Sequence, residues 1–298
     1  MSQNSNSAAP IHGTVEKYGR FYGLWRYEKY LLPIDAEELD RLDMSHKFFT
    51  VARNYALYSP RLTDQRPLRV LDLGTGTGIW AISFAEAHRH QPEIQAVDLH
   101  LIQPARIPRG MTTIQFDIED ENWDVLMTNC DIVYLRALYG SIHPSSWPSI
   151  YRNIFNHLLP RSGYVEHVEI DWVARWEGND IPRQSAVNEW SDLLLRSLER
   201  FDRDARIDSA AIRRTIEGAG FVDFEEVTIP CYMTPWMENE QAQDTARWFN
   251  VSFCQGLVAM SLRPMIEGLG KEDRFVHDLC RRVHEEVCQL RHHVYFTM

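Results

Sequence analysis

Three glycines at alternate positions, Gly74, Gly76 and Gly78, follow a short apolar run and stand just after Asp72. A helical spacing of apolar residues begins at Ile79, so the sequence predicts a strand, a tight turn and a helix. Glycine permits backbone angles closed to other residues, and it lets the main chain approach a ligand under the positive end of the helix. This pattern favours a nucleotide-type cofactor over a turn that binds nothing.

The spacing of the glycines separates two kinds of cofactor. The dinucleotide fingerprint G-x-G-x-x-G requires glycine at position 79, where this sequence has Ile79. An acid, Asp98, ends a second apolar run 20 residues after Gly78, and an acid in that place accepts hydrogen bonds from both ribose hydroxyls. With h for an apolar residue, the form hhDhGxGxG resembles motif I of class I S-adenosylmethionine (AdoMet) methyltransferases.

Strands and helices are predicted to alternate from residue 68 onward. Strands are expected at 69–73, 94–98, 112–116, 131–136, 163–171, 221–229 and 293–296, and helices at 79–88, 146–158 and 208–217. Parallel strands with crossover helices are the natural arrangement of such a chain, apart from a last edge or antiparallel strand. The predicted fold class is therefore α/β: a class I methyltransferase Rossmann-like fold with a mostly parallel, seven-stranded sheet and helices on both faces.

Segments on either side of this alternation are expected to add to the core. Residues 1–14 are mostly polar and are predicted to be a disordered tail rather than a signal peptide. Residues 15–66 combine an aromatic and basic stretch with a helix that starts at a capping box of Asp35 and Glu38, and they are predicted to form an N-terminal lid. The core is expected over 67–298, with a C-terminal helical insertion, or cap, at about 236–289.

Composition excludes several classes of function. The 31 basic residues against 42 acidic ones give a net charge of −11, which argues against general nucleic-acid binding. Five dispersed cysteines without a C-x-x-C pair indicate neither a disulfide framework nor a metal site, and they fit a reducing compartment, the cytoplasm or the nucleus. No apolar run is long enough to span a membrane.

With these elements in place, the chain resembles the LaeA-type fungal methyltransferases, regulators of secondary metabolism. The residues that carry the resemblance are Leu71 to Ala81 (LDLGTGTGIWA), Asp98 and Leu99 followed by Ile102-Gln103-Pro104, Tyr18 to Tyr22, Leu32 to Asp35, Asp40 to Lys47, Gly140 to Ile142, and Val168 to Asp171. The resemblance implies an AdoMet-binding methyltransferase whose N-terminal segment folds over the cofactor. One departure is His167, where much of the family is expected to have Gln.

Further cofactor contacts are expected beyond the turn. Leu99 follows the ribose-binding acid, and Asp117 and Ile118 follow the strand at 112–116, where an acid can bind the adenine amino group and an apolar side chain can cover the ring. Arg136 ends its strand where it could meet the methionine carboxylate. The alternatives are an ordinary loop acid for Asp117 and a strand cap for Arg136.

Residues ahead of the core are also expected at the cofactor. The resemblance places His46 near it, although His46 lies on an apolar helical stripe and could be a core histidine. Tyr18 and Tyr22 belong to the aromatic stretch, and a bound sulfonium favours an aromatic surround.

The sequence leaves the methyl acceptor open. His143 and His167 are the candidates for orienting or deprotonating an acceptor hydroxyl, because histidine can accept a proton near neutral pH. The alternative is that both are structural.

A small-molecule natural product is the favoured acceptor. A regulatory methyltransferase acting through a protein partner, and an AdoMet-fold protein that transfers no methyl group, are the alternatives. A closed apolar cavity would favour the small molecule.

Overall fold

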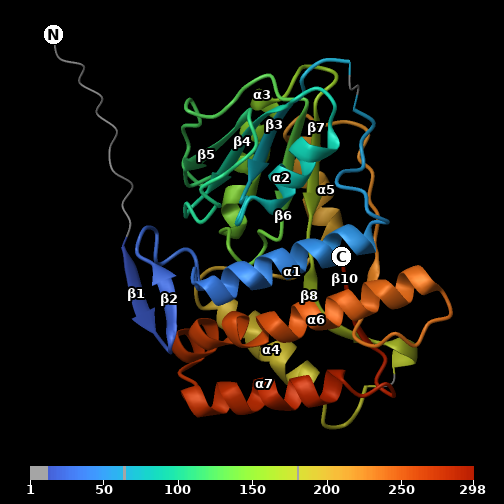
Figure 1. Ribbon diagram of the computed structural model, residues 1–298. Helices are drawn as coiled ribbons and strands as arrows, with labels where there is room; N and C mark the ends of the chain where they lie inside the picture. The colour runs from blue at the N-terminus through green and yellow to red at the C-terminus, as the bar shows by residue number, and fades with distance from the viewer. Residues whose placement is uncertain (1–12, 63–64, 180) are drawn as a thin grey trace.

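A five-stranded parallel sheet forms the centre of the computed structural model, which describes residues 13–62, 65–179 and 181–298 (Figure 1). Its strands stand in the order β5-β4-β3-β6-β7, every pair parallel. The strands are β3 (Arg69–Leu73), β4 (Glu93–Asp98), β5 (Met111–Gln115), β6 (Ile132–Arg136) and β7 (Tyr164–Val168). The central strands are apolar and buried on both faces, as covered parallel sheets require.

Helices cover both faces of the sheet, as the alternating pattern predicts. Helix α2 (Ile79–Ala87) packs on one face, where Trp80 stacks on Tyr134 of β6 with ring centroids 3.8 Å apart. Helices α3 (Trp147–His157) and α5 (Ser209–Gly218) pack on the opposite face. Because all five strands run parallel, their carboxyl ends lie at a single edge of the sheet, the edge where ligands bind in open α/β sheets.

The predicted single sheet of seven strands is divided in the structure. Strands β8 (Asp171–Trp176), β10 (Val294–Thr297) and β9 (Pro230–Tyr232) form a separate antiparallel sheet in the order β8-β10-β9. The predicted strand at 163–171 breaks after Val168, because the Glu169 carboxylate turns back to accept hydrogen bonds from the backbone N–H groups of Leu138 and Tyr139.

The predicted strand at 221–229 is also absent from the structure. Most of this segment lies exposed, with Val222 79% and Val227 77% accessible, and a strand begins only at Pro230. Phe221 and Phe224 pack partly buried against the core of the sheet. The acidic side chains between the two exposed valines leave no continuous apolar face for a strand to bury.

The N-terminal segment contains a hairpin as well as the expected helix. Strands β1 (Thr14–Lys17) and β2 (Arg20–Gly23) pair antiparallel, and α1 (Ala36–Ala52) follows. The side chain of Asp35 accepts a hydrogen bond from the backbone N–H of Glu38, which confirms the predicted helix start. The predicted tail at 1–14 lies outside the described residues except at its end, where Thr14 begins β1.

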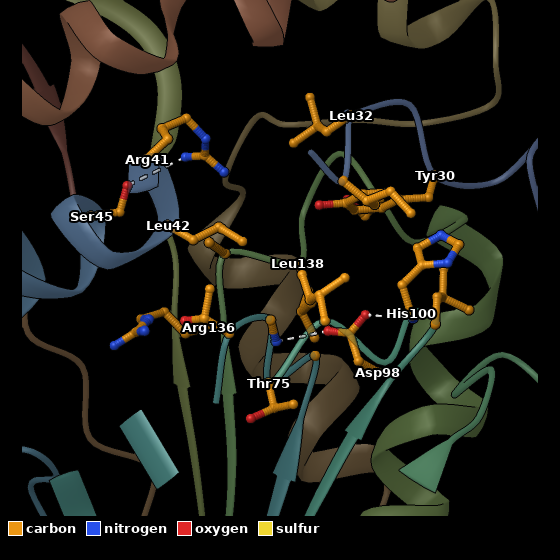
Figure 2. Close-up of a pocket in the computed structure, with 18 of the residues that line it drawn as sticks. Tyr30, Leu32, Arg41, Leu42, Ser45, Thr75, Asp98, His100, Arg136 and Leu138 are labelled. Carbon is orange, nitrogen blue, oxygen red and sulfur yellow. Dashed lines mark hydrogen bonds between the residues drawn. The ribbon is translucent and has the colours of Figure 1, made fainter. Parts of the chain in front are cut away.

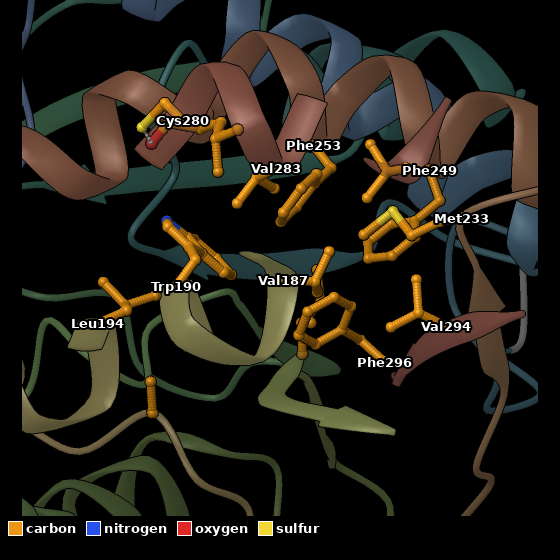
Figure 3. Packing of buried hydrophobic residues seen from close by; sticks show 14 of the residues in the cluster. Val187, Trp190, Leu194, Met233, Phe249, Phe253, Cys280, Val283, Val294 and Phe296 are labelled. Carbon is orange, nitrogen blue, oxygen red and sulfur yellow. Dashed lines mark hydrogen bonds between the residues drawn. The ribbon is translucent and has the colours of Figure 1, made fainter. Parts of the chain in front are cut away.

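The remaining helices enclose a second core beside the sheet (Figure 3). They are α4 (Ala186–Glu199), α6 (Glu240–Arg263) and α7 (Asp273–Val287), with short 3₁₀ helices at Pro144–Ser146 and Glu177–Asn179 and a π-helix at Pro264–Gly268. Trp190, Phe253 and Phe296 meet edge to face or tilted in this core. In the described part of the chain, no helix is sufficiently long and apolar to cross a membrane.

Helix α1 joins the two cores. It runs beside α6 (Figure 1), and the rings of Phe48 and Phe249 lie 4.8 Å apart at this contact. Its other side faces the carboxyl ends of the parallel strands. A cavity therefore forms between the sheet below and helices α1 and α6 above.

Candidate functional site

A cavity of about 170 Å³ lies at the carboxyl ends of β3, β4 and β6 (Figure 2). Its floor is the glycine turn, residues 74–77, with 98–100 on one side and 136–138 on the other. Residues 116–119 complete the lining together with residues of the segment 30–34, of α1, of α6 and of the stretch 170–172. Elements far apart in the chain thus enclose one space above the turn.

The turn has the geometry that its glycines allow. Gly74, Gly76 and Gly78 have φ angles of 72°, 58° and 78°, all in the left-handed region that disfavours side chains. A Cβ atom at Gly74 would lie 2.3 Å from Leu138, whereas one at Gly76 would meet only Leu42, at 3.5 Å, and would fill the cavity floor. Gly78 stands immediately before α2 and lies under the turn, outside the cavity lining.

Asp98 supports the turn and also faces the cavity (Figure 2). Its carboxylate accepts hydrogen bonds from the backbone N–H of Gly76 at 2.8 Å and of His100 at 3.0 Å. Burial raises the pKa of Asp98, and these backbone hydrogen bonds lower it. Each carboxylate oxygen can accept a second hydrogen bond, so the group can bind a pair of ligand hydroxyls.

Asp72 lies beneath the turn and does not line the cavity. It is 3% exposed, and the hydroxyl of Thr75 donates a hydrogen bond to it at 2.6 Å. Burial raises the pKa of Asp72 to about 7. The side chain therefore holds the turn together from below.

Replacing Asp72 with asparagine is expected to make stability less dependent on pH. An acid whose pKa is raised by folding contributes stability at pH below its ordinary 3.8, and this contribution is lost as pH rises towards 7. Asparagine cannot ionise and still accepts a hydrogen bond from Thr75. As pH rises towards 7, the free energy of unfolding of the variant should therefore increase relative to that of the wild type, by about 1.4 kcal/mol for each pH unit. Urea unfolding at pH 5 and pH 8 measures this, and parallel curves for both proteins would refute it.

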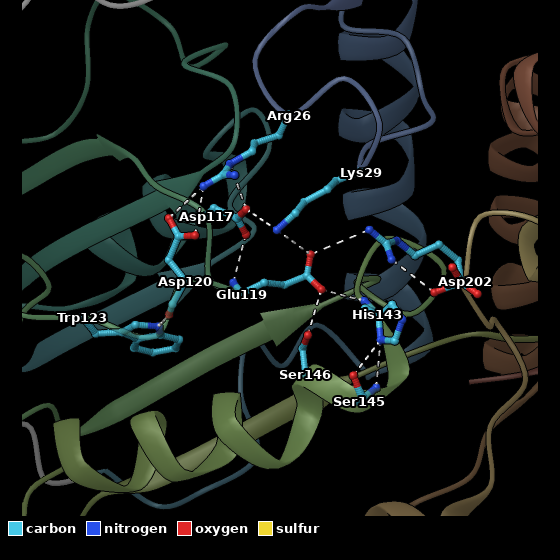
Figure 4. A network of polar contacts seen from close by, with 11 residues as sticks. Arg26, Lys29, Asp117, Glu119, Asp120, Trp123, His143, Ser145, Ser146 and Asp202 are labelled. Carbon is cyan, nitrogen blue, oxygen red and sulfur yellow. Dashed lines mark hydrogen bonds and ion pairs between the residues drawn. The ribbon is translucent and has the colours of Figure 1, made fainter.

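At the far end of β5, Asp117 is already paired with the N-terminal segment (Figure 4). Its carboxylate, 2% exposed, lies 2.6 Å from Lys29 Nζ and 3.2 Å from Arg26 Nε. Glu119 also pairs with Lys29, at 3.2 Å. Asp117 and Ile118 both line the cavity, so the loop after β5 and the N-terminal segment meet at its edge.

Arg136 and His46 form a contact at the opposite edge. A guanidinium N–H of Arg136 lies 3.2 Å from His46 Nδ1, and the group also covers the ring of Phe49. Burial, and secondly the positive charge of Arg136, lower the pKa of His46 to about 3. The imidazole is therefore neutral, and its Nδ1 accepts a hydrogen bond from Arg136. Arg136 lines the cavity, but Figure 2 shows its guanidinium turned away from Asp98. His46 lies behind it, outside the lining.

Tyr18 and Tyr22 do not reach the cavity. The Tyr18 hydroxyl donates to Glu267 at 3.3 Å, and Tyr22 is fully buried beside Arg263. Tyr30, later in the same aromatic stretch, is the tyrosine that lines the cavity.

The two predicted histidines also stand outside the lining. The His143 side chain caps the 3₁₀ helix before α3 through the backbone N–H of Ser145. His167 lies between the hydroxyl of Tyr151, at 2.7 Å, and the carboxylate of Glu169, at 2.6 Å. Because Glu169 holds the loop that follows β6, His167 supports the cavity wall from outside.

Sequence reasoning predicted a helical cap at about 236–289 but did not identify the side chains of the upper wall of the cavity. Arg41 and Ser45 come from α1, and Phe249, Ser252 and Phe253 from α6. The only local signal was Glu38 followed by Arg41, a spacing that pairs charges on a helix. The approach of α6 to α1 depends on packing between segments about 200 residues apart and has no signature in either segment.

Comparison with known proteins gives consistent matches. The methyltransferase domain family matches residues 44–226. The chain is 48% identical over 282 residues to a protein of Hypocrea atroviridis named secondary metabolism regulator LAE1, covering 95% of this chain and 80% of that protein. It is 44% identical over 294 residues to secondary metabolism regulator laeA of Fusarium oxysporum f. sp. lycopersici, covering 99% and 93%.

Solved structures are more distant. Phosphoethanolamine N-methyltransferase 2 of Haemonchus contortus, in complex with S-adenosyl-L-methionine, is 16% identical, with a TM-score of 0.47 over 85% of this chain and 51% of that one.

Proposed function

This chain belongs to the methyltransferase domain family and to the fungal secondary metabolism regulators named LaeA and LAE1, and from that premise we propose that it is an AdoMet-dependent methyltransferase. The observation that carries the proposal is the pairing of the open turn at Gly76 with the buried carboxylate of Asp98. The proposed acceptor is a small-molecule natural product of secondary metabolism. The proposed location is the cytoplasm or the nucleus.

The residues present fit AdoMet. Gly76 leaves free the space that a Cβ atom would fill, so the backbone can meet a ligand directly. Asp98 has the acceptors for two ribose hydroxyls, and Ile118 and Leu99 supply apolar surface for a flat base. When bound, AdoMet supplies a methyl group on a sulfonium, which is electrophilic without further activation.

The chain's own residues would orient the reactants and exclude water. We propose Gly74, Gly76, Asp98, Leu99, Asp117, Ile118 and Arg136 as the residues that contact the cofactor. Two residues would hold the turn from behind, Asp72 and Gly78. Arg136 would be held in the same way by His46. Tyr18 and Tyr22 would anchor the N-terminal segment, residues 15–66, which serves as a lid, and His143 and His167 would position the wall beside the acceptor.

The cavity favours a small acceptor over a protein side chain. Its upper wall is closed by Phe249 and Phe253 of α6, by Trp172 and by the segment at residues 30–34, so the space is roofed and largely apolar. A roofed apolar space suits a small molecule, which can bury most of its surface there. Among the described residues, no group of histidine, cysteine or carboxylate side chains could hold a metal ion.

Incubation with methyl-labelled AdoMet and a host metabolite extract tests the proposal. We expect label in a small apolar product, and none with the Asp98→Ala variant. Label confined to the protein fraction would favour the second candidate function, a regulator that modifies a partner protein, for which the relatives' names are the motivating observation. Absence of label in both fractions would contradict methyl transfer.

A further inference from the structure

We propose that the part of the cavity above the glycine turn is an acceptor compartment for a ring-shaped, uncharged molecule, whose hydroxyl or carbonyl oxygen is bound by Tyr30 and Arg41. The inference rests on the proposed function, because it treats the space nearest Gly76 and Asp98 as the cofactor's. It adds what the acceptor must look like and which residues select it.

The apolar half of this compartment comes from outside the parallel sheet. Phe249, Phe253 and Met260 of α6 line it from above, and Trp172 of β8 closes its side. The rings of Trp172 and Phe253 lie 6.2 Å apart, tilted at 31°. Aromatic walls of this kind bury a flat apolar body and fix its orientation.

Arg41 is held at the cavity wall by a buried network. Two of its nitrogens donate to the carboxylate of Glu38, at 2.8 and 2.7 Å, and Glu38 is fully buried. A third nitrogen lies 3.3 Å from the hydroxyl of Ser45, which lies 2.9 Å from that of Ser252 on α6. A buried ion pair costs desolvation energy that apolar residues would avoid, and here it holds a guanidinium, with N–H groups to spare, at the wall of the cavity.

The packing of α6 leaves room for this arginine. A Cβ atom at Gly256 would lie 2.8 Å from Cδ of Arg41, so only glycine lets α6 approach at this point. Figure 2 shows the guanidinium at the edge of the cavity, facing the side from which Tyr30 and Leu32 approach.

Tyr30 supplies the second polar group. Its ring meets His100 edge to face, with centroids 5.8 Å apart, and Figure 2 shows its hydroxyl pointing into the cavity. That hydroxyl makes no hydrogen bond to any residue in the described part of the chain. Burial raises the pKa of Tyr30 far above its ordinary value, so the hydroxyl keeps its proton and can donate.

These two groups define the chemistry of the acceptor. Both offer N–H or O–H donors, so a partner needs oxygen lone pairs. The charge of Arg41 is already balanced by Glu38, so the compartment favours a neutral hydroxyl or carbonyl over a carboxylate. The Tyr30 hydroxyl can also accept a hydrogen bond, but the Arg41 guanidinium only donates, so an ammonium or guanidinium group beside Arg41 would be repelled by its charge and would leave its free N–H groups unpaired.

Calorimetry with β-naphthol and naphthalene as probes tests the compartment without requiring turnover. In full-length protein saturated with S-adenosylhomocysteine, we expect β-naphthol to bind on the order of tenfold more tightly than naphthalene, the effect of one to two net hydrogen bonds. Tyr30→Phe should bring the two affinities together, whereas the matched Tyr55→Phe, at an exposed tyrosine, should keep them apart.

A second variant tests Arg41 without leaving a buried charge unpaired. Glu38→Gln combined with Arg41→Met removes both charges together, and it should also abolish the preference for β-naphthol while the affinity for S-adenosylhomocysteine stays unchanged. If the cofactor product fails to bind the wild type, the proposed function itself is wrong. If S-adenosylhomocysteine binds but the protein binds β-naphthol no more tightly than naphthalene, the compartment is wrongly assigned. The same conclusion follows if the double variant loses affinity for S-adenosylhomocysteine and keeps its preference for β-naphthol.

Discussion

Replacing Asp98 with alanine is expected to weaken AdoMet binding by about a hundredfold or more. The carboxylate faces the cavity and is the group that we propose to accept both ribose hydroxyls, and hydrogen bonds to a charged group contribute about 1.5–3 kcal/mol each. The variant also loses the acceptor for the backbone N–H of Gly76, so the turn itself becomes looser. Isothermal titration calorimetry with AdoMet and with its demethylated product measures the change.

Two further variants separate these effects. Asp98→Asn can keep an acceptor oxygen for Gly76 but exchanges one ribose acceptor for a donor, so its affinity should fall between those of the wild type and alanine. Asp40→Ala removes an exposed acid of α1 and should bind as the wild type does. Unchanged affinity in Asp98→Ala, or tight binding of NADH by the wild type, would overturn the cofactor assignment.

Replacing Arg263 with alanine is expected to give the largest loss of stability. This arginine is 2% exposed, and it donates to the backbone carbonyls of Tyr27 and Tyr30 at 2.8 and 2.9 Å. It also pairs with Glu267 at 3.1 Å and lies 3.6 Å from the ring centroid of Tyr27. Removing one partner of a buried network leaves the others unpaired, at a cost of about 3–5 kcal/mol.

The loss should be concentrated in the N-terminal segment. Residues 27–30 lose their attachment to the end of α6, so limited proteolysis should cut this segment faster, and AdoMet affinity should fall because the segment that follows closes part of the cavity. Arg281→Ala is the matched control, since that arginine makes only exposed ion pairs on α7 and such pairs contribute little. Equal stability of the two variants would show that the segment is held by other contacts.

Some of the site could be predicted because its signals are local. The glycines at alternate positions require left-handed backbone angles, and the structure has them at Gly74, Gly76 and Gly78. An apolar run ending in an acid predicts that Asp98 leaves β4 at the carboxyl edge, and it does. In a parallel sheet all such edges coincide, so strand order along the chain is enough to bring the turn and the acid together.

A local pattern decides less where it suits two outcomes. The aromatic stretch at residues 18–30 had to be buried, yet its composition does not say which ring faces a ligand. Tyr22 packs beside Arg263, and Tyr30 faces the cavity. The segment predicted as a strand at 221–229 contains residues that favour strands, but its acids interrupt both faces, β10 pairs with β8 and β9 instead, and the valines stay exposed.

The sequence by itself determined the parallel core, the glycine turn and the acid beside it, because each follows from backbone angles or from the period of apolar residues within one short segment. Only the tertiary structure decided the upper half of the cavity. Arg41 on α1 and Ser252 on α6 are far apart in the chain, and they meet because both helices bury apolar faces against each other. Side-chain contact between distant segments depends on how whole helices pack, which no short stretch of residues encodes.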